Sequence, residues 1–212
     1  MFHSNEATDE LEKLKKENGQ LRKKLVDEKK LVAENNALRD QFKSNTPSGS
    51  KLLPAQVIGA PAFMPGVSQP EKLILAVGKK DGVKKGDVVL VNNNLIGNIE
   101  RVFSTMSVVL PLTVFSRPFT AKTLGTNAIG LIRSTNGGLY LENVVLSETL
   151  KKGDIVVTKG DVDETESGFA PDIIIGKIVS IDKKASNLFQ SAKVQSLVDL
   201  SKVTIVFIYH TI

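Results

Sequence analysis

The sequence contains no cysteine and no tryptophan, and only two tyrosines and two histidines among its 212 residues. Without cysteine, the chain can form neither a disulfide nor a thiolate zinc site, and it has no thiol nucleophile. The scarcity of aromatic residues counts against a surface on which bases or sugars stack. These absences exclude several classes of catalysis and favour a structural or binding role.

Long apolar runs and arginine-rich patches are missing as well. No stretch approaches the about 20 consecutive apolar residues of a membrane helix, and no signal-peptide core follows Met1. The formal net charge of +5 comes mainly from lysine. Because arginine is rare, we expect no nucleic-acid partner. The lysine excess is typical of a solubilised surface, although it would also favour an anionic membrane or cell-wall polymer.

The N-terminal part is predicted to be one long helix from Thr8 to Phe42. Good helix formers dominate this stretch, and its only glycine is Gly19. Acidic residues follow Thr8 and suit the positive end of the helix dipole. Residues 44–50 have the polar, Pro- and Gly-containing composition of a linker. We therefore assign residues 1–50 to a helical stalk and linker.

Apolar residues recur along this helix in alternating steps of three and four, which is the seam of an α-helical coiled coil. The frame shifts near Glu28, which predicts a three-residue stammer. Seam asparagines commonly fix a two-stranded register, so we predict a parallel homodimer. The alternative is a single helix packed on its own head. The predicted interface residues are Leu11, Leu14, Asn18, Leu21, Leu25, Val32, Asn35 and Leu38.

From residue 51 onward, short β-branched runs alternate with turn residues at intervals of about ten. This spacing is typical of an all-β sandwich or barrel. The chain is therefore expected to be mainly β, with an N-terminal coiled coil. The predicted strands are Ala55–Gly59, Leu73–Val77, Asp87–Val91, Leu95–Val102, Ser107–Pro111, Ala128–Arg133, Gly138–Glu142, Asp154–Thr158, Ile173–Ile181 and Val203–Tyr209.

An internal repeat divides the β-rich part. Residues 83–90 resemble residues 150–157, and each copy is followed by a strand that contains a glycine. In the Lys-x-Gly-Asp turns the glycine is expected at positive φ or in a tight bend, and the strand glycines are expected to mark a bulge or bend. These structural glycines are Gly86, Gly97, Gly153 and Gly176.

The repeat predicts that residues 51–212 form an all-β head of two related small barrels, divided near residues 120–128. The segment 55–59 has no partner strand of its own nearby. We therefore regard the C-terminal strand 203–209 as a candidate to complete the first barrel.

A double barrel also raises the alternative of a chymotrypsin-like hydrolase, which needs a general base beside a nucleophile. The available bases are His3 and His210, and no nucleophile turn motif accompanies either. A coil joined to a β head also occurs in membrane-fusion-type secretion adaptors, but those usually have a returning second helix. We predict no catalytic residue and no cofactor.

Four further loops contain candidate binding residues. The acidic loop lacks calcium-loop spacing and is expected to be solvated, so no metal ligand is predicted. The basic stretch 78–86 lacks the ending of a phosphate-binding loop. The apolar loops 63–67 and 115–119 either cap the barrel ends or form an exposed binding patch. The acidic residues are Asp161, Asp163, Glu164 and Glu166.

A series of short segments, each weak by itself, occurs in an order that resembles the rod shape-determining protein MreC family across nearly the whole chain. After the leucine- and asparagine-containing coil, these segments are 53–59 (LPAQVIG), 73–75 (LIL), 81–87 (DGVKKGD), 95–97 (LIG), 137–142 (GGLYLE), 152–158 (KGDIVVT), 175–178 (IGKI) and 206–208 (VFI).

The resemblance implies a membrane-associated dimer whose β head lies on the extracytoplasmic face of the bacterial cytoplasmic membrane. It implies a scaffold or activator of cell-elongation peptidoglycan synthesis, with MreD, RodA, a class B penicillin-binding transpeptidase and, indirectly, MreB as partners. The heads could also self-associate further. The family's usual transmembrane helix before the coil is absent from this sequence, so the anchor is expected elsewhere. The acidic residue expected after Thr113 is also absent, and no role is transferred to that loop.

Overall fold

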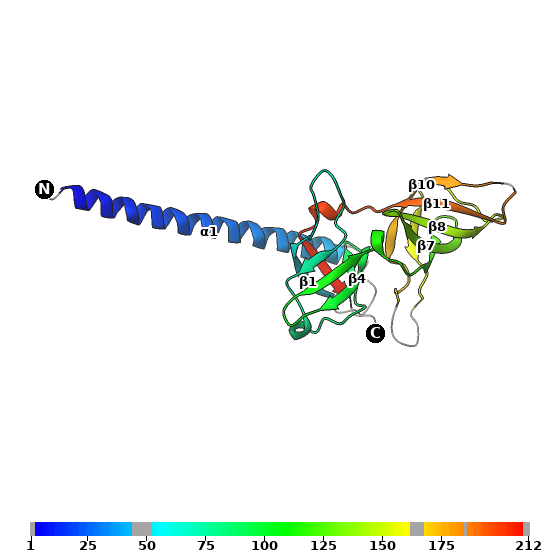
Figure 1. Cartoon of the computed structure of the whole chain (residues 1–212), viewed down its shortest axis with the longest axis horizontal. Helices are drawn as coiled ribbons and strands as arrows, with labels where there is room; N and C mark the ends of the chain where they lie inside the picture. The colour runs from blue at the N-terminus through cyan, green and yellow to red at the C-terminus, as the bar shows by residue number, and fades with distance from the viewer. Residues whose placement is uncertain (1–2, 44–51, 162–167, 185, 210–212) are drawn as a thin grey trace. The chain divides into compact units, whose positions relative to one another are not determined.

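The computed structural model describes residues 3–43, 52–161, 168–184 and 186–209, with helix side chains described for residues 12–38. The chain divides into two compact units, Met1–Phe42 and Lys43–Ile212. Figure 1 shows a helix in the first unit and strands in the second. A mainly β protein with one long N-terminal helix is therefore confirmed.

The N-terminal unit is a single α-helix, α1, from His3 to Lys43. It begins five residues before the predicted Thr8, because residues 3–7 contain no glycine or proline to interrupt it. All side chains from Glu12 to Asn36 are exposed in this single chain. Whether a second helix covers them stays a prediction. Among the described residues, no helix has both the length and the apolar character that crossing a membrane requires.

The described residues of the second unit form twelve strands and three short 3₁₀ helices. The strands are β1 Leu52–Gly59, β2 Leu73–Leu75, β3 Val88–Val91, β4 Asn94–Val102, β5 Ser107–Pro111, β6 Phe119–Thr123, β7 Ile129–Thr135, β8 Gly138–Val145, β9 Ile155–Thr158, β10 Ile174–Asp182, β11 Phe189–Gln195 and β12 Ile205–Tyr209. The 3₁₀ helices are η1 Lys79–Asp81, η2 Leu112–Val114 and η3 Leu200–Lys202.

Two of these strands, β6 and β11, were not predicted. Their inward positions include small or polar side chains such as Thr123, Gln190 and Ala192, all of which are buried. The outward positions include lysine on both strands. The β-branched runs by which the other strands were found are therefore missing from both segments.

The strands close into two rings. The first ring has the order β4-β3-β12-β1-β2-β5, and a β4–β5 pairing closes it. The second has the order β11-β8-β7-β6-β9-β10, and a β10–β11 pairing closes it. A short parallel contact, with Ile174 opposite Asn94, joins the two rings. In Figure 1, β1 and β4 mark the first ring, and β7, β8, β10 and β11 mark the second.

The two rings follow the same circuit with different chain connections. In the second ring, the consecutive strands β6 to β11 pair in a closed cycle. The first ring has the same cycle when β12 is matched to β6 and the strands β1 to β5 are matched, in order, to β7 to β11. The second ring is thus inserted between β5 and β12. The division of the head into two subdomains stays a prediction, because both rings belong to one compact unit.

The Lys-x-Gly-Asp turns have matching backbone geometry. Gly86 and Gly153 have φ values of 95° and 88°, in the left-handed region that favours glycine. The Gly86 N–H donates to the carbonyl oxygen of Ile99 at 2.9 Å, and the Gly153 N–H donates to that of Ile178 at 2.8 Å. Each turn is therefore bonded to the second strand after it, β4 in the first ring and β10 in the second.

The strand glycines lie next to matching irregularities in the ladders. Between β3 and β4 the pairing passes from Gly97 to Leu95, which leaves Ile96 as an extra residue. Between β9 and β10 it passes from Gly176 to Ile174, which leaves Ile175 as an extra residue. Such β-bulges bend a strand and increase its twist, as closing a small ring requires.

Both strand glycines allow a neighbouring strand to approach closely. A Cβ atom on Gly97 would lie 2.1 Å from the carbonyl oxygen of Leu110 on β5. A Cβ atom on Gly176 would lie 2.2 Å from the carbonyl oxygen of Gln195 on β11. No side chain fits at such distances, so only glycine allows β5 and β11 to close their rings here.

Two clusters of buried apolar side chains stabilise the head. The smaller cluster fills the first ring around Leu75, Val89 and Ile99. The larger cluster fills the second ring around Leu141, and it also includes Leu90 of the first ring. Apolar contacts therefore continue from one ring to the other.

We predict that Gly97→Ala and Gly176→Ala each lower the free energy of unfolding by about 2 kcal/mol or more, because the added methyl group must displace a backbone carbonyl. Chemical denaturation of the purified variants measures the effect. Gly59→Ala is the matched control, since its Cβ atom would lie 3.6 Å from Ile74, an ordinary contact. Equal stability of all three variants would contradict the proposed role of the two crossings.

Candidate interaction surfaces

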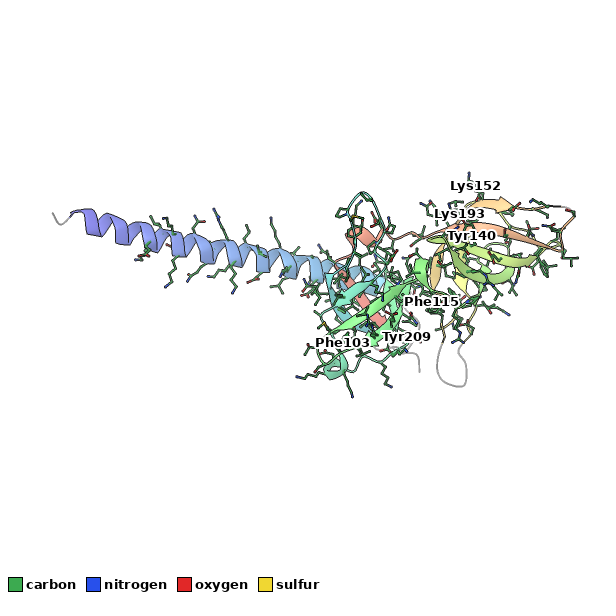
Figure 2. All side chains as sticks on the ribbon, viewed as in Figure 1. Phe103, Phe115, Tyr140, Lys152, Lys193 and Tyr209 are labelled. Atoms are coloured by element: carbon green, nitrogen blue, oxygen red, sulfur yellow. The ribbon has the colours of Figure 1, made fainter. Side chains whose placement is uncertain are left out.

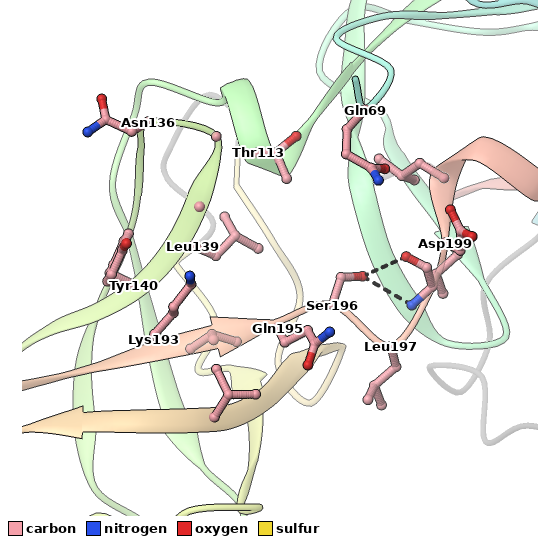
Figure 3. A pocket seen from close by; sticks show the side chains of 16 residues that line it. Gln69, Thr113, Asn136, Leu139, Tyr140, Lys193, Gln195, Ser196, Leu197 and Asp199 are labelled. Atoms are coloured by element: carbon pink, nitrogen blue, oxygen red, sulfur yellow. Dashed lines mark hydrogen bonds between the residues drawn. The ribbon is translucent and has the colours of Figure 1, made fainter. Parts of the chain in front are cut away.

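A groove of about 760 Å³ lies where the two rings meet. The β7–β8 turn, the end of β11 and the connection from β11 to η3 line it, together with Gln69 and Thr113. Figure 3 shows Asn136, Tyr140 and Lys193 on the second-ring side. Its lining combines polar side chains such as Asn136 and Lys193 with apolar ones such as Leu197, so the groove can offer both hydrogen bonds and apolar contacts.

Local hydrogen bonds order the connection along this groove. The Ser196 hydroxyl accepts from the Val198 N–H at 3.1 Å, and the dashed lines in Figure 3 mark contacts of this serine. The Asp199 carboxylate accepts from the Ser201 hydroxyl at 2.6 Å and from its N–H at 3.1 Å. The Ser201 hydroxyl, its N–H and the nearby Lys202 together hold the pKa of Asp199 below its usual 3.8. This carboxylate caps η3, which is a structural role.

Exposed apolar side chains gather at the end of the second ring farthest from its connections to the first ring. We call Val145, Leu188 and Phe189 the distal strip. Phe189 and Val145 lie opposite each other on antiparallel strands, so they share a face. Their exposed fractions are 49% and 47%, and that of Leu188 is 81%. Exposed apolar side chains gathered in this way are typical of a protein-binding surface.

A buried glutamine stabilises the backbone beneath the distal strip. Gln190 is 3% exposed, and its amide nitrogen donates to the carbonyl oxygens of Val145 at 3.2 Å and Glu148 at 2.6 Å. The Glu148 carboxylate in turn accepts from the Ile129 N–H at 2.8 Å. These bonds fix the turn after β8 against β11, so the strip is presented on a rigid support.

The predicted seam residues of α1 form a second surface. Leu14, Leu21, Leu25 and Val32 are each more than half exposed, and Asn18 and Asn35 are exposed too. Leu38 is half-buried, and the side chain of Leu11 lies outside the described residues. The sequence prediction therefore corresponds to an apolar stripe that this chain leaves largely uncovered from Glu12 to Asn36.

The other sequence candidates have mixed outcomes. Asp161 accepts hydrogen bonds from the N–H groups of Thr120 and Phe169, at 3.3 and 3.1 Å, so its carboxylate supports a loop. Residues 163, 164, 166 and 210 and the side chain of His3 lie outside the described residues. Among the residues that are described, no group of three His, Cys, Asp or Glu side chains is suited to hold a metal ion.

The two apolar loops behave differently. Phe119 is buried, and Phe115 packs edge-on against Phe119 and Phe169, with ring centroids 6.2 and 5.9 Å apart. This loop therefore caps the core, which was one of the two alternatives predicted for it; the other was an exposed binding patch. In the other loop, Met64 and Val67 are exposed.

The distal strip itself was missed from the sequence. The adjacent apolar pair Leu188–Phe189 follows a polar segment and could have indicated an exposed site. However, β11 was not recognised, and the face of Phe189 depends on that strand. Figure 2 labels Tyr140 and Lys193, which lie on the same ring as the distal strip, and Phe103, which lies on the first ring.

Comparisons with known proteins agree with this architecture. The model of the family "Rod shape-determining protein MreC, barrel core" matches residues 66–210. A curated relative, the cell shape-determining protein MreC of Haemophilus influenzae, is 29% identical over 141 residues. That match covers 65% of this chain and 39% of the relative, so the chain matches about two fifths of the relative's length.

Solved structures share the fold. An MreC structure matches with a TM-score of 0.71 at 20% identity, and the match covers 84% of this chain and 98% of the other. An MreC structure from Listeria monocytogenes has a TM-score of 0.65 at 24% identity, covering 92% and 91%. MreC in a complex with a penicillin-binding protein (PBP2) from Helicobacter pylori has a TM-score of 0.56 at 15% identity, covering 77% and 99%.

The family model covers more than half of the chain and includes most of both rings, with the two Lys-x-Gly-Asp turns and the two crossing glycines. The ordered sequence segments, the paired rings and the family match therefore lead to one conclusion: this chain belongs to the rod shape-determining protein MreC family.

Proposed function

We propose that this chain is a non-enzymatic scaffold or activator of the cell-elongation peptidoglycan synthesis complex, and that it maintains rod cell shape. The observation that carries the proposal is the distal strip, an exposed apolar surface on a braced ring in a protein of this family. A fold relative occurs in a complex with a penicillin-binding protein. A rigid head that binds a synthase through side chains needs no chemistry of its own.

The proposed occupant of the distal strip is a class B penicillin-binding transpeptidase. Phe189 supplies an aromatic anchor, the residue type that commonly dominates interface energetics, and Leu188 extends the apolar area beside it. Lys183 and Lys184 are exposed on the same hairpin and can provide a polar rim. The brace at Gln190 lowers the entropic cost of binding, because the anchors need little reordering.

We further propose that α1 joins two copies in a parallel coiled coil. Its leucines are exposed in a single chain, and covering them with a second helix would remove apolar area from water. The seam asparagines would favour two strands and one register. At about 1.5 Å per residue, a helix of this length is about 60 Å long.

The location and the remaining partners follow from the same proposal. The head is placed on the extracytoplasmic side of the cytoplasmic membrane, where peptidoglycan synthesis occurs. MreD and RodA are proposed as neighbours in the complex, MreB as an indirect partner, and further self-association of heads as a possible assembly mode.

Replacing both Leu188 and Phe189 by serine should weaken binding to the extracytoplasmic part of the class B transpeptidase from the same organism at least tenfold, because the anchors are lost. Biolayer interferometry with immobilised transpeptidase measures the affinity. Ile58→Ser, which removes a 56% exposed apolar side chain from the first ring, is the control and should bind normally. Undiminished binding by a correctly folded double variant would exclude the strip as the docking site.

Light scattering should give the chain about twice its single-chain mass of 23.0 kDa. Leu21→Asp combined with Leu25→Asp should return it to one copy, since each change places a charge in the seam. Gln20→Asp combined with Val26→Asp adds the same charge outside the seam and should leave the dimer intact. A monomeric unmodified chain at micromolar concentration would contradict the coiled coil.

A further inference from the structure

A second exposed apolar surface lies at the tip of the β4–β5 hairpin in the first ring. The Phe103 N–H donates to the Met106 carbonyl oxygen at 2.8 Å, which closes a tight turn. Both side chains are exposed, at 46% and 41%. This tip has no part in the proposed transpeptidase contact, and its apolar side chains would be unfavourable in water without a partner.

The helix η1 holds lysines beside this tip. The Lys79 N–H donates to the carbonyl oxygen of Phe103 at 2.8 Å, and the Lys80 N–H donates to that of Ser104 at 3.1 Å. Gly78 allows this approach, because a Cβ atom there would lie 2.4 Å from the Phe103 carbonyl oxygen. Backbone contacts therefore fix exposed lysines next to exposed apolar side chains. We call Lys79, Lys80, Phe103 and Met106 the basic tip.

Further positive charge surrounds the basic tip. Arg101 is exposed on β4 just before the turn, and Lys84 and Lys85 are exposed in the neighbouring Lys-x-Gly-Asp turn. The nearby carboxylates have structural partners. Asp81 accepts from the Gly78 N–H at 2.8 Å, and Asp87 accepts from the Lys84 N–H at 2.6 Å. Glu100 forms ion pairs with Lys72 at 3.1 Å and with Arg101 at 3.9 Å. Basic residues therefore outnumber acidic ones at this end of the ring.

The basic tip lies at the end of the first ring where β1 begins. Leu52, the first residue of β1, pairs with Tyr209, which also pairs with Val88 at the start of β3. Strand β4 runs antiparallel to β3 and continues past Val88 to the tip. The distal strip belongs to the second ring, so the two surfaces can be occupied independently.

We propose that the basic tip docks on an anionic phospholipid bilayer, with Phe103 and Met106 entering the interfacial region and Lys79 and Lys80 facing lipid phosphates. Apolar side chains flanked by lysines are typical of surfaces that bind an anionic membrane. At this tip, backbone hydrogen bonds hold Lys79 and Lys80 directly against the turn that carries Phe103, instead of at a separate rim. Because the cores of protein interfaces are depleted in lysine, a protein partner fits this arrangement less well. A soluble anionic polymer would use the lysines but would not require the apolar tip.

The test is co-sedimentation of the full chain with vesicles of phosphatidylglycerol and phosphatidylcholine, compared with phosphatidylcholine alone. The chain should bind the anionic vesicles, and added salt should weaken binding. Phe103→Ser combined with Met106→Ser should lower the partition coefficient at least tenfold. Lys79→Gln combined with Lys80→Gln should lower it by about fivefold per lysine, as expected for charges near an anionic surface.

Lys151→Gln combined with Lys152→Gln is the matched charge control, and Ile58→Ser combined with Leu124→Ser is the matched apolar control, because these side chains are exposed away from both proposed surfaces. Both should bind vesicles like the unmodified chain, and thermal unfolding of every variant verifies folding. The proposal is overturned by absence of binding, by equal binding of the Phe103/Met106 variant, or by soluble polyphosphate binding that is equally strong in that variant. Because the transpeptidase assay uses the distal strip, either proposal can fail without the other.

Discussion

The close approach of a strand carbonyl to a glycine is the constraint on which both rings depend. At Gly97 and at Gly176, the neighbouring carbonyl oxygen occupies space that any other residue would fill with its Cβ atom. A bulged isoleucine precedes each glycine and bends its strand toward the crossing. The same local solution occurs twice, so ring closure is encoded by a short repeated segment of sequence. The positions of the distal strip and the basic tip depend on the ring shape that this closure determines.

Closure also determines how the head can bind partners. In both rings, the described strands pair in a complete cycle, so contact through the ring strands falls to side chains on their outer faces. The distal strip and the basic tip lie at or beyond the ends of ring strands, and they differ in chemistry. The first presents an aromatic anchor with a braced backbone, and the second combines apolar side chains with lysines. The proposed partners differ accordingly: a protein binds at the distal strip, and a lipid bilayer binds at the basic tip.

Much of the architecture could be predicted because its signals are local. Helix formers and heptad steps indicated α1, and the repeated Lys-x-Gly-Asp turns indicated two related units with the same turn geometry. Strands β6 and β11 escaped prediction because their buried positions hold threonine, glutamine and alanine, whose packing is decided by tertiary contacts. The exposure of Phe189 and the pairing of η1 with the β4–β5 tip depend on neighbours distant in sequence. The proposed partner helix for α1 would belong to another chain, and no single sequence describes such a contact.

The position of β12 in the first ring has a consequence for biosynthesis. This strand pairs with both β1 and β3, yet it follows the whole second ring in the sequence. During synthesis, the strands of the second ring emerge consecutively and have all their partners before β12 is made. The first ring therefore lacks a strand between β1 and β3 until the whole second ring and then β12 have been synthesised. The first ring can therefore close only after the last strand of the head has been translated. Until then, the unpaired edges of β1 and β3 can associate with other strands.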